Sequence, residues 1–230
     1  MDYSLSCLLM VATTVMKIFL RDKVINTVCK SILPFYPLII ATLTIYFLSQ
    51  VRIGTALFCL YLFPLITWKF INFFYPLKEG KSYIAGPTFS PWLTSYRIQE
   101  IYIKLPVLEK IIMLVPFLYN VWLRAWGSKI GKRVLFAPNI TIIDRAGLEI
   151  GNYVYFGDGC YLSSHLILEK NKKFICFYKK IKIEDNSFIG AFTTLAPGAL
   201  IKEGSRIRTF SFFRMNSDRA ESFVIETNPL

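Results

Sequence analysis

Side chains able to carry out chemistry are scarce in this chain of 230 residues. It has a single histidine, His165, whose imidazole ordinarily changes charge near pH about 6.5 and therefore suits proton transfer. One histidine cannot form a zinc site that needs three, so no metal is expected. The five cysteines are odd in number and form no C-x-x-C pair, which indicates buried thiols in a reducing compartment. A structural role for His165, in the core or at the surface, remains open at this point.

Composition restricts the class of protein that carries this histidine. The chain is 54% hydrophobic with a formal net charge of +12, and its mean hydropathy is +0.45. A disordered tail would be far less hydrophobic, and a soluble nucleic-acid-binding domain would not be this apolar. Apolar runs fill residues 1–82, whereas Gly, Asn and Asp turn residues concentrate after Gly127. The sequence therefore predicts a membrane α-helical N-terminal part followed by a compact C-terminal domain.

A six-residue repeat organises the C-terminal domain. Large apolar residues recur in steps of six in three runs: Ile130, Phe136 and Ile142; Ile150, Phe156 and Leu162; and Ile183, Ile189, Leu195, Ile201 and Ile207. A prism of short parallel strands explains this pattern, because each unit of six residues makes one face and one corner, and stacked coils bury one apolar column. The repeat predicts an all-β left-handed parallel β-helix over residues 128–210, with a C-terminal tail over 211–230.

Two interruptions of the repeat predict where the prism carries extra residues. The step from Ile142 to Ile150 is eight residues, which predicts a small corner bulge near 144–147. The step from Leu162 to Ile183 is twenty-one residues, which predicts an excursion loop over 164–182, most simply a β-hairpin. Insertions in a solenoid usually emerge on the face that binds something. His165 lies at the start of this excursion.

Three apolar segments in the N-terminal part approach the length of a membrane span. They cover about residues 5–20, 32–48 and 53–77, and a span needs roughly 17–25 residues. Basic residues that follow the first and third segments, and the absence of a basic N-terminal tail, predict an N-terminus outside and a C-terminal domain in the cytoplasm. The basic residues are Arg21, Lys23, Lys30, Lys78 and Lys81, with only Arg52 in the short link between the second and third segments. The predicted location is the inner or plasma membrane.

Residues 83–127 differ from both parts. Apolar residues recur there at helical spacing, Pro106 and Pro116 interrupt them, and Trp122 and Trp126 lie near the end. The uncharged stretch is too short to cross a bilayer. An interfacial amphipathic linker or helix on the lipid headgroups fits this pattern, and a core helix that caps the next domain fits it equally well.

The repeat resembles the hexapeptide-repeat acyltransferase family, above all in IEDNSFIGAFTTLAPGALIKEGSRI over 183–207. Over a wider stretch, PWLTSYRIQEIY, LYNVWLRAWGSKIGKRVLF and GCYLSSHLILE are similar to the membrane-embedded β-helix module at the C-terminal end of Pls/PosA-type peptide synthetases, of which this chain would be one half. The resemblance implies an acyltransferase that forms a homotrimer, with active sites in grooves between neighbouring prisms. An acetyl-CoA, other acyl-CoA or acyl-carrier thioester would lie along each groove.

The resemblance also implies roles for particular residues. A histidine near a loop is the general base of this family, and His165 is the only residue to which that role transfers. Candidates for the carboxylate that orients it are Asp158, Glu169 and Glu184, of which Asp158 is preferred, although each also suits a turn or a solvated charge. Donors for the oxyanion are expected among the backbone N–H groups of Ser163, Ser164 and Gly190.

Small and basic residues of the later coils match the family's region for the thioester donor. Small residues would let the pantetheine arm approach the backbone, and basic side chains would hold the nucleotide phosphates. The small residues are Gly190, Ala191, Ala196, Pro197 and Gly198, and the basic ones are Lys202, Arg206 and Arg208. Corner geometry alone accounts for each small residue equally well.

The excursion is basic, since residues 169–182 contain six lysines and one acidic residue. This charge would bind anionic lipid headgroups, steer an anionic substrate, or only be solvated; no nucleic-acid partner is expected. The predicted function is a membrane-bound acyltransferase, foremost an O-acetyltransferase, that acts on a hydroxyl of a membrane-associated acceptor such as a lipid-linked glycan or surface-polymer precursor. Alternatives are an amine acceptor, which would make the product an amide or peptide bond, and a non-catalytic trimeric β-helix scaffold. A β-helix carbonic anhydrase is not expected, because its zinc takes three histidine ligands from adjoining subunits and this chain has one histidine.

Overall fold

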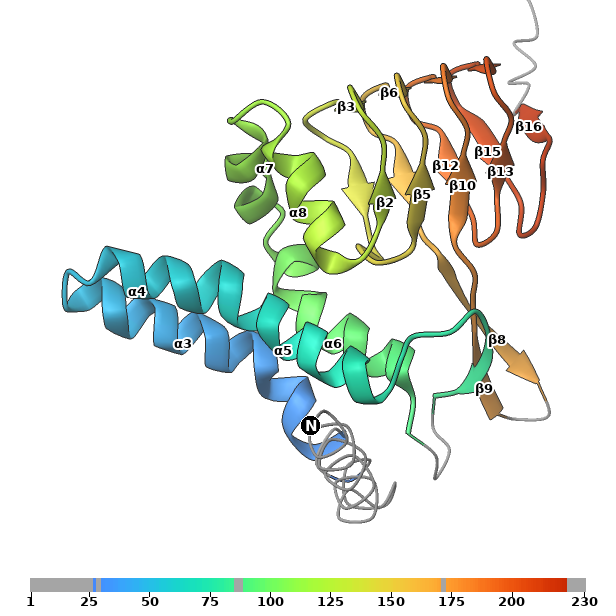
Figure 1. The fold of residues 1–230 in the computed structure, drawn as a ribbon. Helices are drawn as coiled ribbons and strands as arrows, with labels where there is room; N and C mark the ends of the chain where they lie inside the picture. The colour runs from blue at the N-terminus through green and yellow to red at the C-terminus, as the bar shows by residue number, and fades with distance from the viewer. Residues whose placement is uncertain (1–26, 28–29, 85–88, 171–172, 223–230) are drawn as a thin grey trace, which may run out of the picture.

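The computed structural model describes residue 27 and residues 30–84, 89–170 and 173–222. Short strands wind into stacked coils in the C-terminal half, and a pair of apolar helices projects from the other end of the molecule (Figure 1). Three further helices lie between these two parts. A β-hairpin extends from one corner of the coils, beside the helical part.

The coils consist of three sheets of parallel strands, which form the three faces of a prism. The first face contains β2 (Lys129–Ile130), β5 (Leu148–Ile150), β10 (Ile181–Ile183) and β13 (Leu200–Ile201). The second contains β3 (Leu135–Phe136), β6 (Tyr155–Phe156), β11 (Phe188–Ile189) and β14 (Arg206–Ile207). The third contains β4 (Thr141–Ile142), β7 (Tyr161–Leu162), β12 (Thr194–Leu195) and β15 (Ser211–Phe213), with β16 (Ala220–Ser222) added antiparallel to β15.

The apolar residues of the six-residue repeat stack in register inside this prism. On the first face Ile150 pairs with Ile130 and with Ile183, and Ile183 pairs with Ile201. All four are buried, so the interior is one apolar column, as the repeat predicts. At most corners the residue three places after the repeat residue has a left-handed backbone conformation, as does Asn186 with φ 58°. The left-handed winding of the coils stays a prediction.

The strands continue past the predicted end of the prism. Residues 211–230 are predicted to be a tail, yet β15 begins at Ser211 and pairs in parallel with β12. Phe213 takes the repeat position opposite Leu195 and is 1% exposed. The repeat thus holds for one more step of six, from Ile207 to Phe213.

The long excursion forms a hairpin of β8 (His165–Lys170) and β9 (Lys173–Tyr178). A third strand, β1 (Gly80–Tyr83), pairs antiparallel with β9. This strand contains the expected boundary at residue 82 between the membrane part and the linker. The hairpin therefore ties the β-helix to the segment that follows the apolar helices.

The second and third expected spans are helical, whereas the first lies outside the described residues. A 3-10 turn at Leu33–Phe35 leads into α3 (Tyr36–Ser49), and α4 (Ile53–Leu57) continues through a π-helical turn (Phe58–Leu62) into α5 (Phe63–Phe74). Two helical stretches, Lys30–Ser49 and Ile53–Phe74, are long and apolar enough to cross a membrane by length and composition. Helix α5 ends at Phe74, three residues before the predicted end of the third span at residue 77.

Three helices, not one, occupy the linker. They are α6 (Pro91–Lys104), α7 (Val107–Met113) and α8 (Leu118–Trp126), and the breaks between them contain Pro106 and Pro116. Polar contacts fix them to the apolar pair. Pro64 has no N–H to donate to the Leu60 carbonyl four residues before it, and that oxygen accepts a hydrogen bond from the Tyr102 hydroxyl at 2.7 Å. The Trp68 indole N–H likewise donates to the Trp126 carbonyl at 2.9 Å.

Candidate functional site

The two interruptions of the repeat lie at the same corner of the prism, one coil apart. The first joins β4 to β5 through residues 143–147, and the second joins β7 to β10 through residues 163–180. This corner, between the third and first faces, is called here the insertion corner. The extra residues of the first coil include Asp144, and the extra residues of the second begin around His165. Stacking of the coils therefore brings these two residues together.

His165 and Asp144 form a hydrogen-bonded pair. Nδ1 of the imidazole lies 2.7 Å from Oδ2 of Asp144. A carboxylate only accepts hydrogen bonds, so in the neutral imidazole Nδ1 carries the proton and Nε2 keeps its lone pair. The Ser163 hydroxyl, 3.4 Å from Nδ1, donates to the His165 carbonyl at 2.9 Å. The His165 side chain is 13% exposed, so the ring is held in place without being closed off.

Two further donors fix the Asp144 carboxylate. The backbone N–H of Ser164 donates to Oδ2 at 2.9 Å, and the indole N–H of Trp92 donates to Oδ1 at 3.0 Å. Trp92 belongs to α6, and its ring centroid is 4.5 Å from that of His165. Tyr96, one turn further along α6, meets the imidazole edge-on at 6.0 Å. Helix α6 thus completes the environment of the imidazole.

Close stacking at the insertion corner depends on Gly147. A Cβ at this position would lie 2.3 Å from Ser164 Oγ and 3.2 Å from Asp144 Cβ. The Ser164 hydroxyl donates to the Gly147 carbonyl at 2.7 Å. A glycine here lets the two corners approach closely enough for the Ser164 N–H to reach Asp144.

Asp158, the carboxylate preferred from the sequence, is placed elsewhere. It lies at the corner between the second and third faces, before β7, whereas His165 follows β7. Its carboxylate accepts hydrogen bonds from Asn139 of the preceding coil, at 3.1 Å from the backbone N–H and 3.0 Å from Nδ2. Asp158 therefore links two coils, and the carboxylate that hydrogen-bonds to the His165 imidazole is that of Asp144.

The other two candidate carboxylates also have different surroundings. Glu184 accepts a hydrogen bond from the backbone N–H of Glu203 in the next coil at 2.9 Å. Glu169 is exposed in β8, opposite Phe174 of β9. Sequence reasoning missed Asp144, although the eight-residue step marked its corner. Trp92 had no signal of its own, because 52 residues separate it from Asp144.

The three backbone N–H groups considered as oxyanion donors all have acceptors within the protein. Ser163 donates to the Leu195 carbonyl at 3.1 Å, and Gly190 donates to the Ile207 carbonyl at 3.0 Å. The Ser164 N–H is the one that holds Asp144. An oxyanion would thus have to draw on other donors or displace one of these bonds.

The residues considered for the thioester donor lie at all three corners and on one face. Ala196, Pro197 and Gly198 belong to the insertion corner, one coil beyond His165, and Gly198 N–H donates to the Lys179 carbonyl at 3.2 Å. Gly190, Ala191 and Arg208 lie at the opposite edge of the third face. A Cβ on Gly190 would lie 2.5 Å from the backbone nitrogen of Thr209, so coil stacking already requires that glycine.

The two remaining basic candidates lie near the C-terminal end of the coils. Lys202 Nζ is 3.2 Å from the carboxylate of Asp218, and Arg206, exposed on β14, donates to the Asn186 carbonyl at 2.9 Å. Both side chains are thus engaged with their own chain at the surface.

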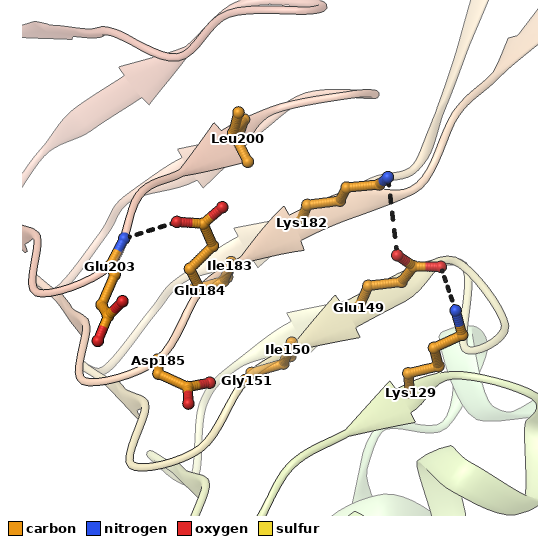
Figure 2. Close-up of a pocket in the computed structure, with 10 residues that line it drawn as sticks. All are labelled: Lys129, Glu149, Ile150, Gly151, Lys182, Ile183, Glu184, Asp185, Leu200 and Glu203. Atoms are coloured by element: carbon orange, nitrogen blue, oxygen red, sulfur yellow. Dashed lines mark hydrogen bonds and ion pairs between the residues drawn. The ribbon is translucent and has the colours of Figure 1, made fainter.

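An open groove of about 570 Å³ lies on the first face rather than beside His165 (Figure 2). Glu149 is one of its lining residues, and the Glu149 carboxylate contacts Lys129 at 3.2 Å and Lys180 at 3.0 Å. Figure 2 shows Lys182 and Glu184 along the same strip. These charges run from strand to strand across the face, and the imidazole at the insertion corner does not line the groove.

Buried thiols near the site are poor nucleophiles. Cys176 of β9 is fully buried beside Trp92. Burial, and to a smaller extent the negative charge of Asp144, raises the pKa of its thiol to about 12. Burial likewise raises the pKa of Cys160, so both thiols stay protonated at neutral pH. Among these groups His165 is the one suited to exchange a proton.

Comparison with known proteins gives matches only among solved structures. No protein-family model and no curated protein matches the sequence. A hexapeptide-repeat-containing acetyltransferase from Vibrio cholerae O1 biovar eltor, in complex with acetyl coenzyme A, is 13% identical over 52% of this chain and 90% of its own, with a TM-score of 0.32. A maltose O-acetyltransferase from Clostridium difficile 630 is 14% identical over 54% of this chain and 84% of its own, with a TM-score of 0.29. The finer resemblance to the synthetase module stays a prediction. Both structural neighbours are thus acetyltransferases, and the first is described as containing the hexapeptide repeat.

Proposed function

We propose that the chain is a membrane-attached acyltransferase. It moves an acyl group, foremost acetyl, from an acyl-CoA thioester to a hydroxyl of a membrane-associated acceptor. His165 Nε2 takes the proton of the acceptor hydroxyl as the oxygen attacks the thioester carbonyl, the C–S bond breaks, and CoA leaves as its thiol after receiving that proton. Lipid-linked glycans and surface-polymer precursors are the expected acceptor class.

One observation carries this proposal: the hydrogen bond of 2.7 Å between His165 Nδ1 and the Asp144 carboxylate. A carboxylate at Nδ1 selects the tautomer whose Nε2 accepts a proton, and it stabilises the imidazolium that forms. The same carboxylate is fixed by Trp92 and by the Ser164 N–H. Two donors besides the imidazole keep this carboxylate in one orientation, as a base that must take up and release a proton requires.

The position of the site supports a membrane-associated acceptor. Trp92 and Tyr96 come from α6, which packs on the apolar helices through the bond from Tyr102 to Leu60. The exposed apolar side chains of α7, of α8 and of the turn between them, among them Leu114, Val115 and Val121, are suited to the lipid headgroup region. We therefore place the catalytic domain on the cytoplasmic side of the inner or plasma membrane, with α7 and α8 at its interface.

A homotrimer forms part of the proposal. Candidate residues for the thioester occupy opposite edges of the third face, and two prisms side by side would bring one edge of each to a shared groove. The outer surface carries exposed Tyr155 and Phe188 on the second face, and Phe192 stacked on Phe210 at 5.0 Å. A second copy would cover such aromatic residues. The mass of the protein in detergent, measured by light scattering, tests for three copies.

The test of the activity uses radiolabelled acetyl-CoA, the full chain in lipid nanodiscs, and lipid and glycan extracts from cells that lack the gene. Wild-type protein should transfer label to a component of the extract. His165→Ala should lower the rate by roughly 10²–10⁴-fold, the usual contribution of a general base. A wild type that labels nothing, or a His165→Ala variant that labels as fast as wild type, would contradict the proposal.

The same product distinguishes the alternatives. Mild alkali cleaves an O-acyl ester, whereas an amide survives it, so alkali-stable label would identify an amine acceptor. A non-catalytic scaffold would assemble normally and transfer no label, with or without His165. Unchanged assembly and thermal unfolding of His165→Ala are the control that the variant is folded.

A further inference from the structure

The residue after Asp144 is a fully buried arginine. Arg145 is 1% exposed, and its guanidinium makes two bonds to the Glu109 carboxylate of α7, from Nε at 2.7 Å and from Nη2 at 2.5 Å. The Trp122 indole N–H donates to the same carboxylate at 2.9 Å. Burial by itself lowers the pKa of Arg145, but the charge of Glu109, its hydrogen bonds and the smaller effects of Tyr119 and Tyr102 together outweigh burial, so that the pKa is raised. The Arg145 guanidinium is therefore charged in the interior, with the Glu109 carboxylate as its partner.

The backbone of Arg145 is held as well. Its N–H, which belongs to the peptide bond that follows Asp144, donates to Oε1 of Gln99 at 2.9 Å. Gln99 lies in α6, is 1% exposed, and is itself fixed by its Nε2 donating to Ser95 Oγ at 2.7 Å. On the other side the Arg145 carbonyl accepts from the Ser128 hydroxyl at 2.7 Å. The corner has no strand pairing of its own, and these contacts replace it.

We propose that Arg145, Glu109 and Gln99 are positioning residues that aim the Asp144 carboxylate at His165 Nδ1. The proposal deepens the proposed function and rests on it for its kinetic readout. The Asp144–Arg145 peptide belongs to a bulge two residues longer than the repeat requires. The N–H of this peptide is held by α6 and the Arg145 side chain by α7, so the direction of the Asp144 side chain is set by these helices as well as by the prism.

A role in stability alone does not explain this arrangement. A buried ion pair is often no more stabilising than apolar side chains of similar volume, because both charges lose their hydration. It does impose a geometry, since a guanidinium and a carboxylate joined by two bonds have one relative orientation. Stability and orientation can therefore be separated by replacing both partners at once.

The test uses the fact that His165 is the only imidazole in the chain. Full-length protein labelled with ¹⁵N-histidine, purified through a tag without histidine and placed in bilayers, gives imidazole signals from His165 alone. Solid-state NMR then reports which ring nitrogen carries the proton. Wild type should show the Nδ1-protonated tautomer when the ring is neutral. Turnover with acetyl-CoA is measured on the same samples.

The decisive variant carries Arg145→Met together with Glu109→Leu. We expect an unfolding temperature close to that of wild type, a mixture of the two tautomers, and turnover at least tenfold lower with the KM for acetyl-CoA unchanged. Wild-type tautomer and turnover in the folded double variant would overturn the proposal. Lys129→Met, which breaks the exposed ion pair with Glu149, is the control and should change neither signal.

Gln99→Leu keeps the proposal testable if the double variant does not fold. It leaves the two bonds of the Arg145–Glu109 pair intact and removes the acceptor of the Arg145 N–H, together with the bonds of the Gln99 amide to Ser95 and to Arg145 Nη1. It should therefore also give mixed tautomers and lower turnover. A wild-type tautomer in Gln99→Leu would overturn the proposal. If the tautomer responds as expected while no acceptor is ever labelled, the proposed function fails and the positioning role stands.

Discussion

The imidazole of His165 has two nitrogens, and its neighbours determine which one carries the proton. Asp144 accepts from Nδ1, whereas Asp158 accepts two bonds from Asn139 at another corner. Both are aspartates on the same prism, and the sequence favours Asp158 because it lies one coil corner before the histidine. The two carboxylates therefore give a matched comparison.

Asp144→Asn should lower turnover by roughly 10²–10⁴-fold, because the new amide can donate to Nδ1 and favour the wrong tautomer. Asp158→Asn should leave turnover per folded molecule unchanged and cost about 1 kcal/mol of stability through weaker bonds to Asn139. Labelling assays and thermal unfolding of both variants measure these effects. Equal losses of turnover in the two variants would refute the assignment of Asp144.

The stacking of two successive coils brings Asp144 and His165 together, because the two residues belong to two stacked corners rather than to one loop. The approach of these corners depends on Gly147, where a Cβ would meet Ser164. Gly131 offers a matched comparison, because a Cβ there would lie 2.3 Å from the Gly151 carbonyl oxygen at a different corner. Both positions combine tight coil stacking with glycine, and only the first is next to the imidazole.

Gly147→Ala and Gly131→Ala should each destabilise the protein by about 1–3 kcal/mol through overpacking. Only Gly147→Ala should also lower turnover per folded molecule, because it moves the Ser164 N–H away from Asp144. Thermal unfolding and labelling rates of the two variants measure this. A Gly147→Ala protein with normal turnover would show that the corner spacing does not matter to the site.

The whole molecule places this corner against helices that expose apolar side chains. Leu114 is 80% exposed in the turn after α7, and Val121 is 53% exposed in α8. Leu135 is comparably exposed at 46% on the second face of the prism. If α7 and α8 lie at a bilayer surface, the first two side chains meet lipid and the third meets water.

Spin labels on cysteines at positions 114, 121 and 135, each in a chain whose native cysteines are replaced, test this orientation in nanodiscs. Labels at 114 and 121 should collide mainly with oxygen, which concentrates in lipid. The label at 135 should collide mainly with a water-soluble nickel chelate. Equal access of the chelate to all three labels would remove the case for lipid contact at α7 and α8.

Much of the fold was readable because its physical causes are local and repeated. The step of six from Ile130 to Ile207 reflects one apolar side chain per face, and the structure stacks Ile130, Ile150, Ile183 and Ile201 in one column. The two interruptions marked the corner that bears the site. The extra step from Ile207 to Phe213 was missed because the residue directly after Ile207 is the large Arg208, whereas most coils have a small residue at that position.

The sequence by itself determined the repeat, the apolar helices and the single imidazole, because periodicity and residue type are properties of neighbouring positions. Only the tertiary structure decided the partner of that imidazole. Asp144 reaches His165 by coil stacking across 21 residues, and Trp92 and Gln99 reach Asp144 and Arg145 from a separate helix. Hydrogen bonds depend on distances of about 3 Å between atoms, and no spacing along a chain specifies which distant side chains will meet at that range.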